Sequence, residues 1–202
     1  MADAIGRLRD FARGMTAVVE RAGGDEARIF AEGAPLLKAL VSVDDWLPET
    51  YAKPHPEHYE QYLLFCDLQE RFSVVSFVWG PGQKTPVHDH TVWGMIGMLR
   101  GSETCRGYAF KDGHLATGAF ERLQPGDVAT VSPRVGDIHE VANAFADRTS
   151  VSIHVYGANI GAVQRHIYHP GCIGPAKIFV SGYANEATPS LFPSKGGLVA
   201  AL

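Results

Sequence analysis

The stretch PVHDHTVWGMIGMLRG, residues 86–101, places His88 and His90 one residue apart and follows them with an apolar run. Successive side chains of a β-strand point to opposite faces, so these two imidazoles would share one face. Their Cβ atoms would lie roughly 6–7 Å apart. That separation suits two ring nitrogens that converge on one metal ion, although histidines also fall at this spacing by chance.

The sequence around this stretch indicates a β-protein. Short segments rich in Val, Phe, Tyr, Trp and Thr alternate with Gly, Pro, Asp and Asn. The segments are QYLLFCD, FSVVSFVWG, TVWGMIGML, ETCRGYAF, DVATVSP and TSVSIHVYG. This pattern predicts an all-β sandwich or barrel.

The N-terminal part predicts helices instead. Apolar residues recur there at spacings of three and four, at Ile5, Leu8, Phe11, Met15 and Val18. Gly23 is expected to end this helix and Asp25 to cap a second one, which Pro35 would interrupt. A Pro-containing connector then leads to the first β-segment.

Length and composition narrow the protein class. The chain has 202 residues, of which 46% are hydrophobic and 20% charged, as in a globular domain. Its net charge of -4 argues against a basic nucleic-acid surface. No apolar run approaches the roughly 18 residues of a membrane span, and the N-terminus lacks the apolar block of a signal peptide. We therefore expect a cytoplasmic protein without a membrane or nucleic-acid partner.

Two motifs give the histidines a context. The pattern G-x5-H-x-H spans residues 82–90, and G-x2-H-x3-N follows a Pro-Gly pair and spans residues 136–143. Together they resemble the two-part signature of the cupin superfamily, with one residue more than usual on each side of the proline in the second part. The resemblance implies a double-stranded β-helix barrel that holds a metal through His88, His90 and His139.

This resemblance implies one mainly β cupin domain over residues 1–202. It would consist of a helical segment at 1–45, a jelly-roll-like β-barrel core at 60–168, and a C-terminal tail at 169–202 that packs on the barrel. Three widely spaced cysteines and no CxxC motif predict neither a disulfide framework nor a zinc ribbon.

One departure from the cupin pattern concerns the metal. The usual cupin has a Glu a few residues after the second His, where this chain has Trp93, Gly94 and Met95. No carboxylate follows until Glu103. Three neutral imidazoles would leave a divalent metal its full charge and open positions, which favours an anionic ligand such as a thiolate.

A second pattern lies in the segment SVSIHVY. Ser152, His154 and Tyr156 alternate along it, so they would share one strand face. They could form a relay in which each residue orients the next, with the Tyr hydroxyl facing the metal. A hydrolase triad fits poorly, because adjacent residues of a straight strand lack the nucleophile geometry. The remaining alternative is a solvated strand face.

Three histidines, this Ser-His-Tyr pattern and the missing cupin Glu together resemble the cysteine dioxygenase family of thiol dioxygenases. The resemblance implies one mononuclear Fe(II) per chain, O2 as co-substrate, and Tyr156, His154 and Ser152 as catalytic residues. Animal members carry a Cys crosslinked to the relay Tyr. This chain has no Cys between His90 and Gly101, so the crosslink is expected to be absent.

The substrate-binding residues also follow from the resemblance. Cysteine-specific members hold the substrate carboxylate with an Arg on an early strand, where this chain has Gln61. Arg165 is the next candidate, because a guanidinium grips a carboxylate with two hydrogen bonds. The combination resembles the bacterial branch that prefers 3-mercaptopropionate. Without this resemblance, we would interpret Arg165 as a surface cation and Gln61 as a polar group at a strand edge.

We therefore expect a thiol dioxygenase that converts 3-mercaptopropionate to its sulfinic acid. The alternatives are an L-cysteine dioxygenase that forms cysteine sulfinate and a non-catalytic metal-binding cupin. The expected partner is the small thiol alone, and the expected assembly is a monomer or a small homo-oligomer. The other histidines, 55, 58, 114, 166 and 169, lack ligand spacing and are interpreted as surface or local structure.

Overall fold

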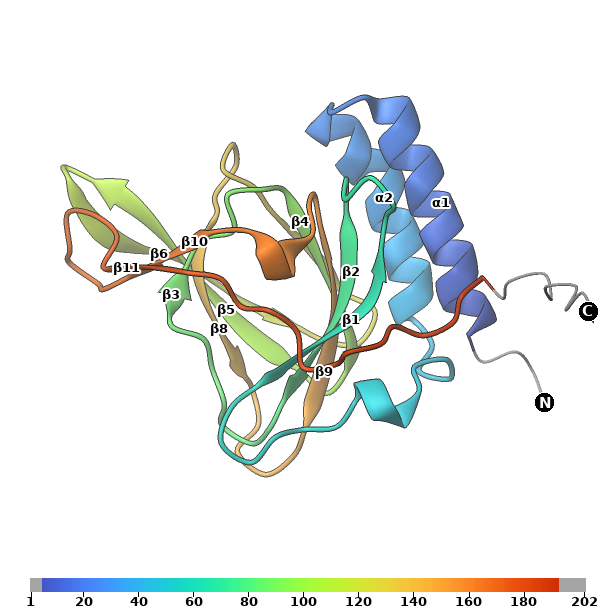
Figure 1. The fold of residues 1–202 in the computed structure, drawn as a ribbon. Helices are drawn as coiled ribbons and strands as arrows, with labels where there is room; N and C mark the ends of the chain where they lie inside the picture. Colours follow the sequence, from blue (N-terminus) through green and yellow to red (C-terminus); the bar gives the residue numbers. More distant parts are fainter. Residues whose placement is uncertain (1–4, 193–202) are drawn as a thin grey trace, which may run out of the picture.

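Two helices precede two antiparallel β-sheets in the computed structural model, which describes residues 5–192 (Figure 1). The first sheet has the order β1-β2-β9-β4-β7, and the second has the order β11-β10-β3-β8-β5-β6. The helices and strands are α1 (Gly6–Ala22), α2 (Glu26–Val41), β1 (Glu60–Cys66), β2 (Ser73–Trp79), β3 (Val87–His88), β4 (Gly94–Arg100), β5 (Glu103–Lys111), β6 (His114–Leu123), β7 (Val128–Val131), β8 (Ile138–Asn143), β9 (Ser150–Tyr156), β10 (Arg165–Tyr168) and β11 (Lys177–Phe179). The predicted mainly β barrel with N-terminal helices is confirmed.

The two helices form because each buries one apolar face. The predicted stripe of α1 is buried, and Gly23 ends the helix in the left-handed conformation with φ of 57°. Asp25 caps α2 by accepting a hydrogen bond from the Arg28 backbone N–H at 3.2 Å. The expected interruption at Pro35 was wrong, since α2 runs through it. Buried residues on both sides of the proline, including Ile29 and Leu37, hold the two halves against the core.

The strands at the middle of the first sheet are covered on both faces. Figure 1 shows α1 and α2 side by side against the sheet that contains β2 and β4. On the helix-facing side, β9 contributes Val151, Ile153 and Val155 to the core that it shares with the helices. Its other face is also buried and carries Ser152, His154 and Tyr156. The alternative of a solvated face is therefore wrong.

The second sheet closes the other side of the barrel. Val141 of β8 packs in one buried cluster with Phe77 and Trp79 of β2, so the two sheets face each other across a common interior. The relay residues of β9 consequently point into the space between the sheets. This interior positions the candidate site.

The described part of the C-terminal tail lies along the barrel. Strand β11 pairs with β10, and the Ala184 backbone N–H donates to the Gln61 carbonyl at 2.8 Å. Residues 193–202 of the expected tail and residues 1–4 of the expected helical segment lie outside the described residues. No helix within residues 5–192 is long and apolar enough to cross a membrane.

Candidate metal centre

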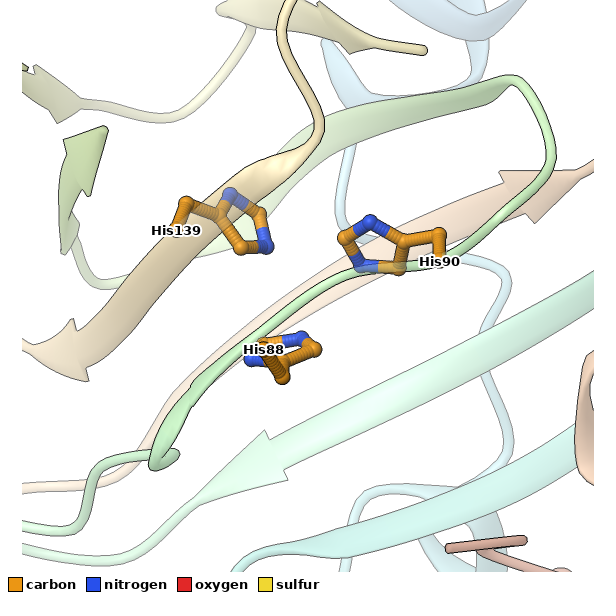
Figure 2. Close-up of side chains that lie close together, drawn as sticks. All are labelled: His88, His90 and His139. Carbon is orange, nitrogen blue, oxygen red and sulfur yellow. The ribbon is translucent and has the colours of Figure 1, made fainter. Parts of the chain in front are cut away.

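The structure brings together the three histidines that the motifs single out. His88 ends β3 and pairs with His139 of β8, whereas His90 lies two residues beyond the strand. The prediction that both residues lie on one strand was therefore correct for His88 and wrong for His90. All three are buried, and their ligand atoms lie within 4.8 Å of one another. Figure 2 shows the three rings facing a common centre.

Each of the three rings has a partner for its Nδ1 atom. His88 Nδ1 donates to the Pro86 carbonyl at 3.0 Å, because a carbonyl oxygen only accepts. His90 Nδ1 lies 2.8 Å from Asp137 Oδ1, and His139 Nδ1 lies 3.3 Å from the Cys105 sulfur. The carbonyl and the carboxylate can only accept, so they reserve the Nε2 lone pairs of His88 and His90 for the centre, which is the usual arrangement of metal-binding histidines.

The electrostatics of the site fit a metal ion. His90 Nε2 is buried and has no hydrogen-bond partner among the described residues. Burial lowers the pKa of His88 to about 3 and the pKa of His139 well below its ordinary value. The rings of His88 and His139 are therefore neutral, which is the form that coordinates a metal. A divalent ion would satisfy the lone pairs that the fold leaves unpaired.

Asp137 is a functional residue that the sequence analysis missed. Its carboxylate accepts hydrogen bonds from the backbone N–H of His90 at 3.0 Å and of Thr91 at 2.8 Å, in addition to the contact with the His90 ring. The His90 hydrogen bonds lower the pKa of Asp137 against the opposing effect of burial. A carboxylate is thus present at the site, as a partner of a ligand. Its position two residues before His139 was the available signal.

The predicted relay is present as a chain of hydrogen bonds. Ser152 Oγ lies 2.9 Å from His154 Nε2, and His154 Nδ1 lies 2.8 Å from the Tyr156 hydroxyl. The Tyr156 ring stacks on His90 with a centroid distance of 5.2 Å. Burial lowers the pKa of His154 and raises the pKa of Tyr156, so both are neutral. The relay leads from Ser152 to the edge of the histidine centre.

The position beside the Tyr156 ring is a glycine. A Cβ on Gly94 would lie 3.0 Å from Tyr156 Cδ1 and 3.1 Å from its Cε1. Cys105, by contrast, contacts His139 and is a free thiol. The residue that faces the Tyr156 ring from β4 is thus a glycine, which carries no thiol.

Arg165 is buried rather than on the surface. It begins β10, is 2% exposed, and donates from Nη2 to the Ser181 hydroxyl at 2.5 Å. Its Nε has no hydrogen-bond partner, and no carboxylate forms a salt bridge with it within residues 5–192. Burial lowers the pKa of Arg165. Its positive charge adds to the burial that lowers the pKa of His88, and it partly opposes the burial that raises the pKa of Tyr156. The guanidinium therefore acts on the same interior as the histidines.

Gln61 lies close to residues that contact Arg165. Its Oε1 is buried without a partner among the described residues. Gln61 lines a cavity of about 360 Å³, to which Phe179 and Ser181 also contribute. Arg165 lies over the Phe179 ring, 4.6 Å from its centroid, and contacts Ser181. Gln61 and Arg165 are thus both close to Phe179 and Ser181, although no direct contact joins them among the described residues.

A second group of possible ligands forms near this cavity. His55, His58 and Glu60 bring their ligand atoms within 4.8 Å of one another, and the two imidazoles stack at 3.9 Å. However, His55 Nδ1 accepts a hydrogen bond from the Glu57 backbone N–H at 3.2 Å. That bond uses the lone pair of Nδ1 and leaves the proton on Nε2, so the ring offers no free lone pair. We interpret this group as local structure.

Comparisons with known proteins identify one matching family and several similar solved structures. The family model described as cysteine dioxygenase type I matches residues 35–169, a range that contains the three histidines, the relay, Gln61 and Arg165. A double-stranded β-helix protein from Klebsiella pneumoniae is 18% identical, with 59% of this chain and 86% of that chain covered and a TM-score of 0.47. The cupin domain of Cnp3 from Schizosaccharomyces pombe is 14% identical, with 50% and 61% covered and a TM-score of 0.40.

Proposed function

We propose, from the premise that this chain belongs to the cysteine dioxygenase type I family, that it oxidises 3-mercaptopropionate to the corresponding sulfinic acid. The family consists of non-haem iron thiol dioxygenases. The finer assignment, a small thiol carboxylate as substrate, comes from the residues of this chain. The observation that carries it is the buried guanidinium of Arg165.

Arg165 is buried without a salt bridge among the described residues, and the charge of Asp89 acts on it only from beyond salt-bridge distance. An ionised group inside a protein is costly unless it is paired, and Arg165 has no carboxylate partner among the described residues. A substrate carboxylate would supply the missing charge and accept hydrogen bonds from the guanidinium fork, including its unpaired Nε. The amide of Gln61, which lines the cavity next to Arg165, would contribute a further donor.

His88, His90 and His139 would hold the iron through their Nε2 atoms. When bound, Fe(II) would supply open coordination positions for a thiolate and for O2, together with the redox chemistry of sulfur oxidation. The three neutral imidazoles add no negative charge, so an anionic thiolate suits the centre. Tyr156 would place its hydroxyl beside the reacting groups, oriented by His154 and Ser152.

L-Cysteine is the second candidate substrate. Gln61 Oε1 is a buried acceptor without a donor in the part of the chain that the structure describes, and a substrate ammonium would provide one. Apart from the thiolate at the metal, 3-mercaptopropionate instead leaves the carboxylate as the one charged group to be held, which matches the cation Arg165. This match is the reason that we favour it.

The test is O2 uptake by the Fe(II)-loaded protein with 3-mercaptopropionate, L-cysteine and cysteamine. We expect the highest kcat/KM with 3-mercaptopropionate and the lowest with cysteamine, which lacks a carboxylate. Arg165→Ala should raise KM for the acid by 10-fold or more, on the order of the 1.5–3 kcal/mol of a charged hydrogen bond, and leave the iron content unchanged.

Arg134→Ala is the matched control, because Arg134 is 71% exposed and remote from the cavity lining. An unchanged KM in Arg165→Ala would exclude Arg165 as the carboxylate anchor. Absence of uptake with every thiol would favour the non-catalytic metal-binding alternative.

A further inference from the structure

Asp89 is a buried carboxylate that the proposed function does not use. It separates His88 from His90 in the sequence and is 7% exposed. A carboxylate inside a protein is costly unless hydrogen bonds or a counter-charge replace the lost water. The hydrogen bonds to Asp89 come from β10, the strand that begins with Arg165.

Three groups of β10 donate to the Asp89 carboxylate. The His166 backbone N–H donates to Oδ1 at 2.8 Å, and the His166 ring Nδ1 and the Tyr168 hydroxyl each donate to Oδ2 at 2.8 Å. An ionised carboxylate only accepts, so the proton of the His166 contact lies on Nδ1. In the reverse direction, the Asp89 backbone N–H donates to the His166 carbonyl at 3.2 Å. The segment between the two ligands is therefore bound to β10 through both its backbone and its side chain.

These hydrogen bonds extend the pairing of β10 with β3 beyond the end of β3. The antiparallel register pairs Ile167 with His88, so the next pair is His166 and Asp89. In a hydrogen-bonded antiparallel pair, each residue donates its N–H to the carbonyl of the other. Asp89 does so, whereas the His166 N–H binds the Asp89 side chain instead. The carboxylate thus replaces a backbone acceptor at the point where the strand ends.

The position of the Arg165 guanidinium depends on the position of β10. Its Nη2 donates to Ser181, it lies over the Phe179 ring of the neighbouring β11, and its Nε has no hydrogen-bond partner among the described residues. Neither contact joins Arg165 to the histidines. The hydrogen bonds between Asp89 and His166, the residue after Arg165, are a direct link between the candidate carboxylate anchor and the metal ligands.

A substrate that is held at both ends makes this link important. The thiolate would bind at the metal and the carboxylate at Arg165, so the carbon chain has to span the interval between them. One methylene more or less changes the reach of the chain by no more than one C–C bond, about 1.5 Å. Selection of one chain length therefore requires an anchor that is fixed on this scale relative to the metal.

We propose that Asp89 is a positioning residue that fixes β10, and with it the guanidinium of Arg165, relative to the metal-binding histidines, and thereby sets the length of the thiol acid that the site accepts. The choice of substrate rests on the proposed function, whereas the link from Asp89 to β10 belongs to the chain itself. Loss of Asp89 should relax the selectivity for chain length while the three histidines still bind iron.

The first test is anaerobic binding of mercaptoacetate, 3-mercaptopropionate and 4-mercaptobutyrate to the Fe(II)-loaded protein, measured by calorimetry. We expect the wild type to bind 3-mercaptopropionate most tightly. Asp89→Ala should weaken this binding by about 10-fold, on the order of one charged hydrogen bond, and bind the three acids with similar affinities. Tyr168→Phe removes one donor and leaves residues 88–90 intact, so it should change the selectivity in the same direction by a smaller factor.

Asp67→Ala is the matched control for these variants. Asp67 is also 7% exposed, and its carboxylate accepts hydrogen bonds from Arg71 in the turn between β1 and β2. Its loss removes a carboxylate of similar burial without touching β10, so the wild-type selectivity should remain. Wild-type selectivity in both Asp89→Ala and Tyr168→Phe would overturn the inference.

The second test requires no thiol. Because Asp89 joins the ligand segment to β10, Fe(II) should slow hydrogen exchange in a peptide that covers residues 165–168, as measured by mass spectrometry. Asp89→Ala should lose this protection and keep the protection around His139, and Asp67→Ala should keep both. Equal protection of β10 in Asp89→Ala and the wild type, or none in either, would refute the link. A wild-type exchange response without binding of any thiol would refute only the proposed function.

Discussion

At the scale of single residues, the carboxylate of Asp137 fixes the orientation of the His90 ring toward the histidine centre. It binds both the backbone N–H and the ring of His90, at 3.0 and 2.8 Å. Partners of this kind fix the orientation of a ligand and raise its basicity, and their loss typically lowers metal affinity about 10- to 100-fold. We expect Asp137→Asn to weaken iron binding by that factor, measured by competition with a chelator.

Asp147→Asn is the control for this prediction, since Asp147 is an exposed carboxylate that forms a salt bridge with the exposed Arg148. Equal iron affinities in Asp137→Asn and the wild type would mean that Asp137 only stabilises the backbone at His90 and Thr91 and does not contribute to iron binding. Nothing in the sequence marks Glu103, the buried first residue of β5, and the position of Asp137 two residues before His139 is too weak a signal to assign its role. A charged residue beside a turn or strand reads as solvated, and only the closing of the two sheets buries both side chains.

At the scale of elements, period-two alternation predicted the relay because β9 pairs regularly with β2 and β4. The same argument failed for His90. Strand β3 ends at His88. The Asp89 N–H still donates to the His166 carbonyl of β10, but the N–H groups that follow, at His90 and Thr91, bind Asp137 instead of a neighbouring strand. Strand β6 was also missed, because most of its residues are exposed and show no buried alternation.

The pairing of β4 with β9 also makes Gly94 a sensitive position. A Cβ there would lie 3.0 Å from both Tyr156 Cδ1 and Val131 Cγ2, so Tyr156 would have to move. We expect Gly94→Ala to lower the free energy of unfolding by about 1–3 kcal/mol, as overpacking does, and to reduce kcat more than iron content. Chemical denaturation and metal analysis measure the two effects. Gly174→Ala, where a Cβ meets no atom within 4 Å, should change neither; a wild-type kcat in Gly94→Ala would show that Tyr156 has room to shift.

At the scale of the whole molecule, the metal centre joins parts of the barrel that are distant in sequence. His88 belongs to β3, which pairs with β10 and β8 in the second sheet, His139 belongs to β8, and Tyr156 of the first sheet stacks on His90. A metal that binds the folded chain alone stabilises it by about 2.7 kcal/mol at a concentration of 100 Kd. For a domain of this size that energy corresponds to roughly 5–11 °C in Tm.

Removal of the metal should therefore lower Tm by several degrees in calorimetry at neutral pH, and Fe(II) should restore it. His139→Ala should have a low Tm that no longer responds to iron, because the centre loses one of its three ligands. His114→Ala should keep the full response, since His114 is an exposed residue outside the group. If Fe(II) raised the Tm of His139→Ala as much as that of His114→Ala, the stabilising ion would bind elsewhere on the chain. The histidine centre would then not be the source of the stabilisation by metal.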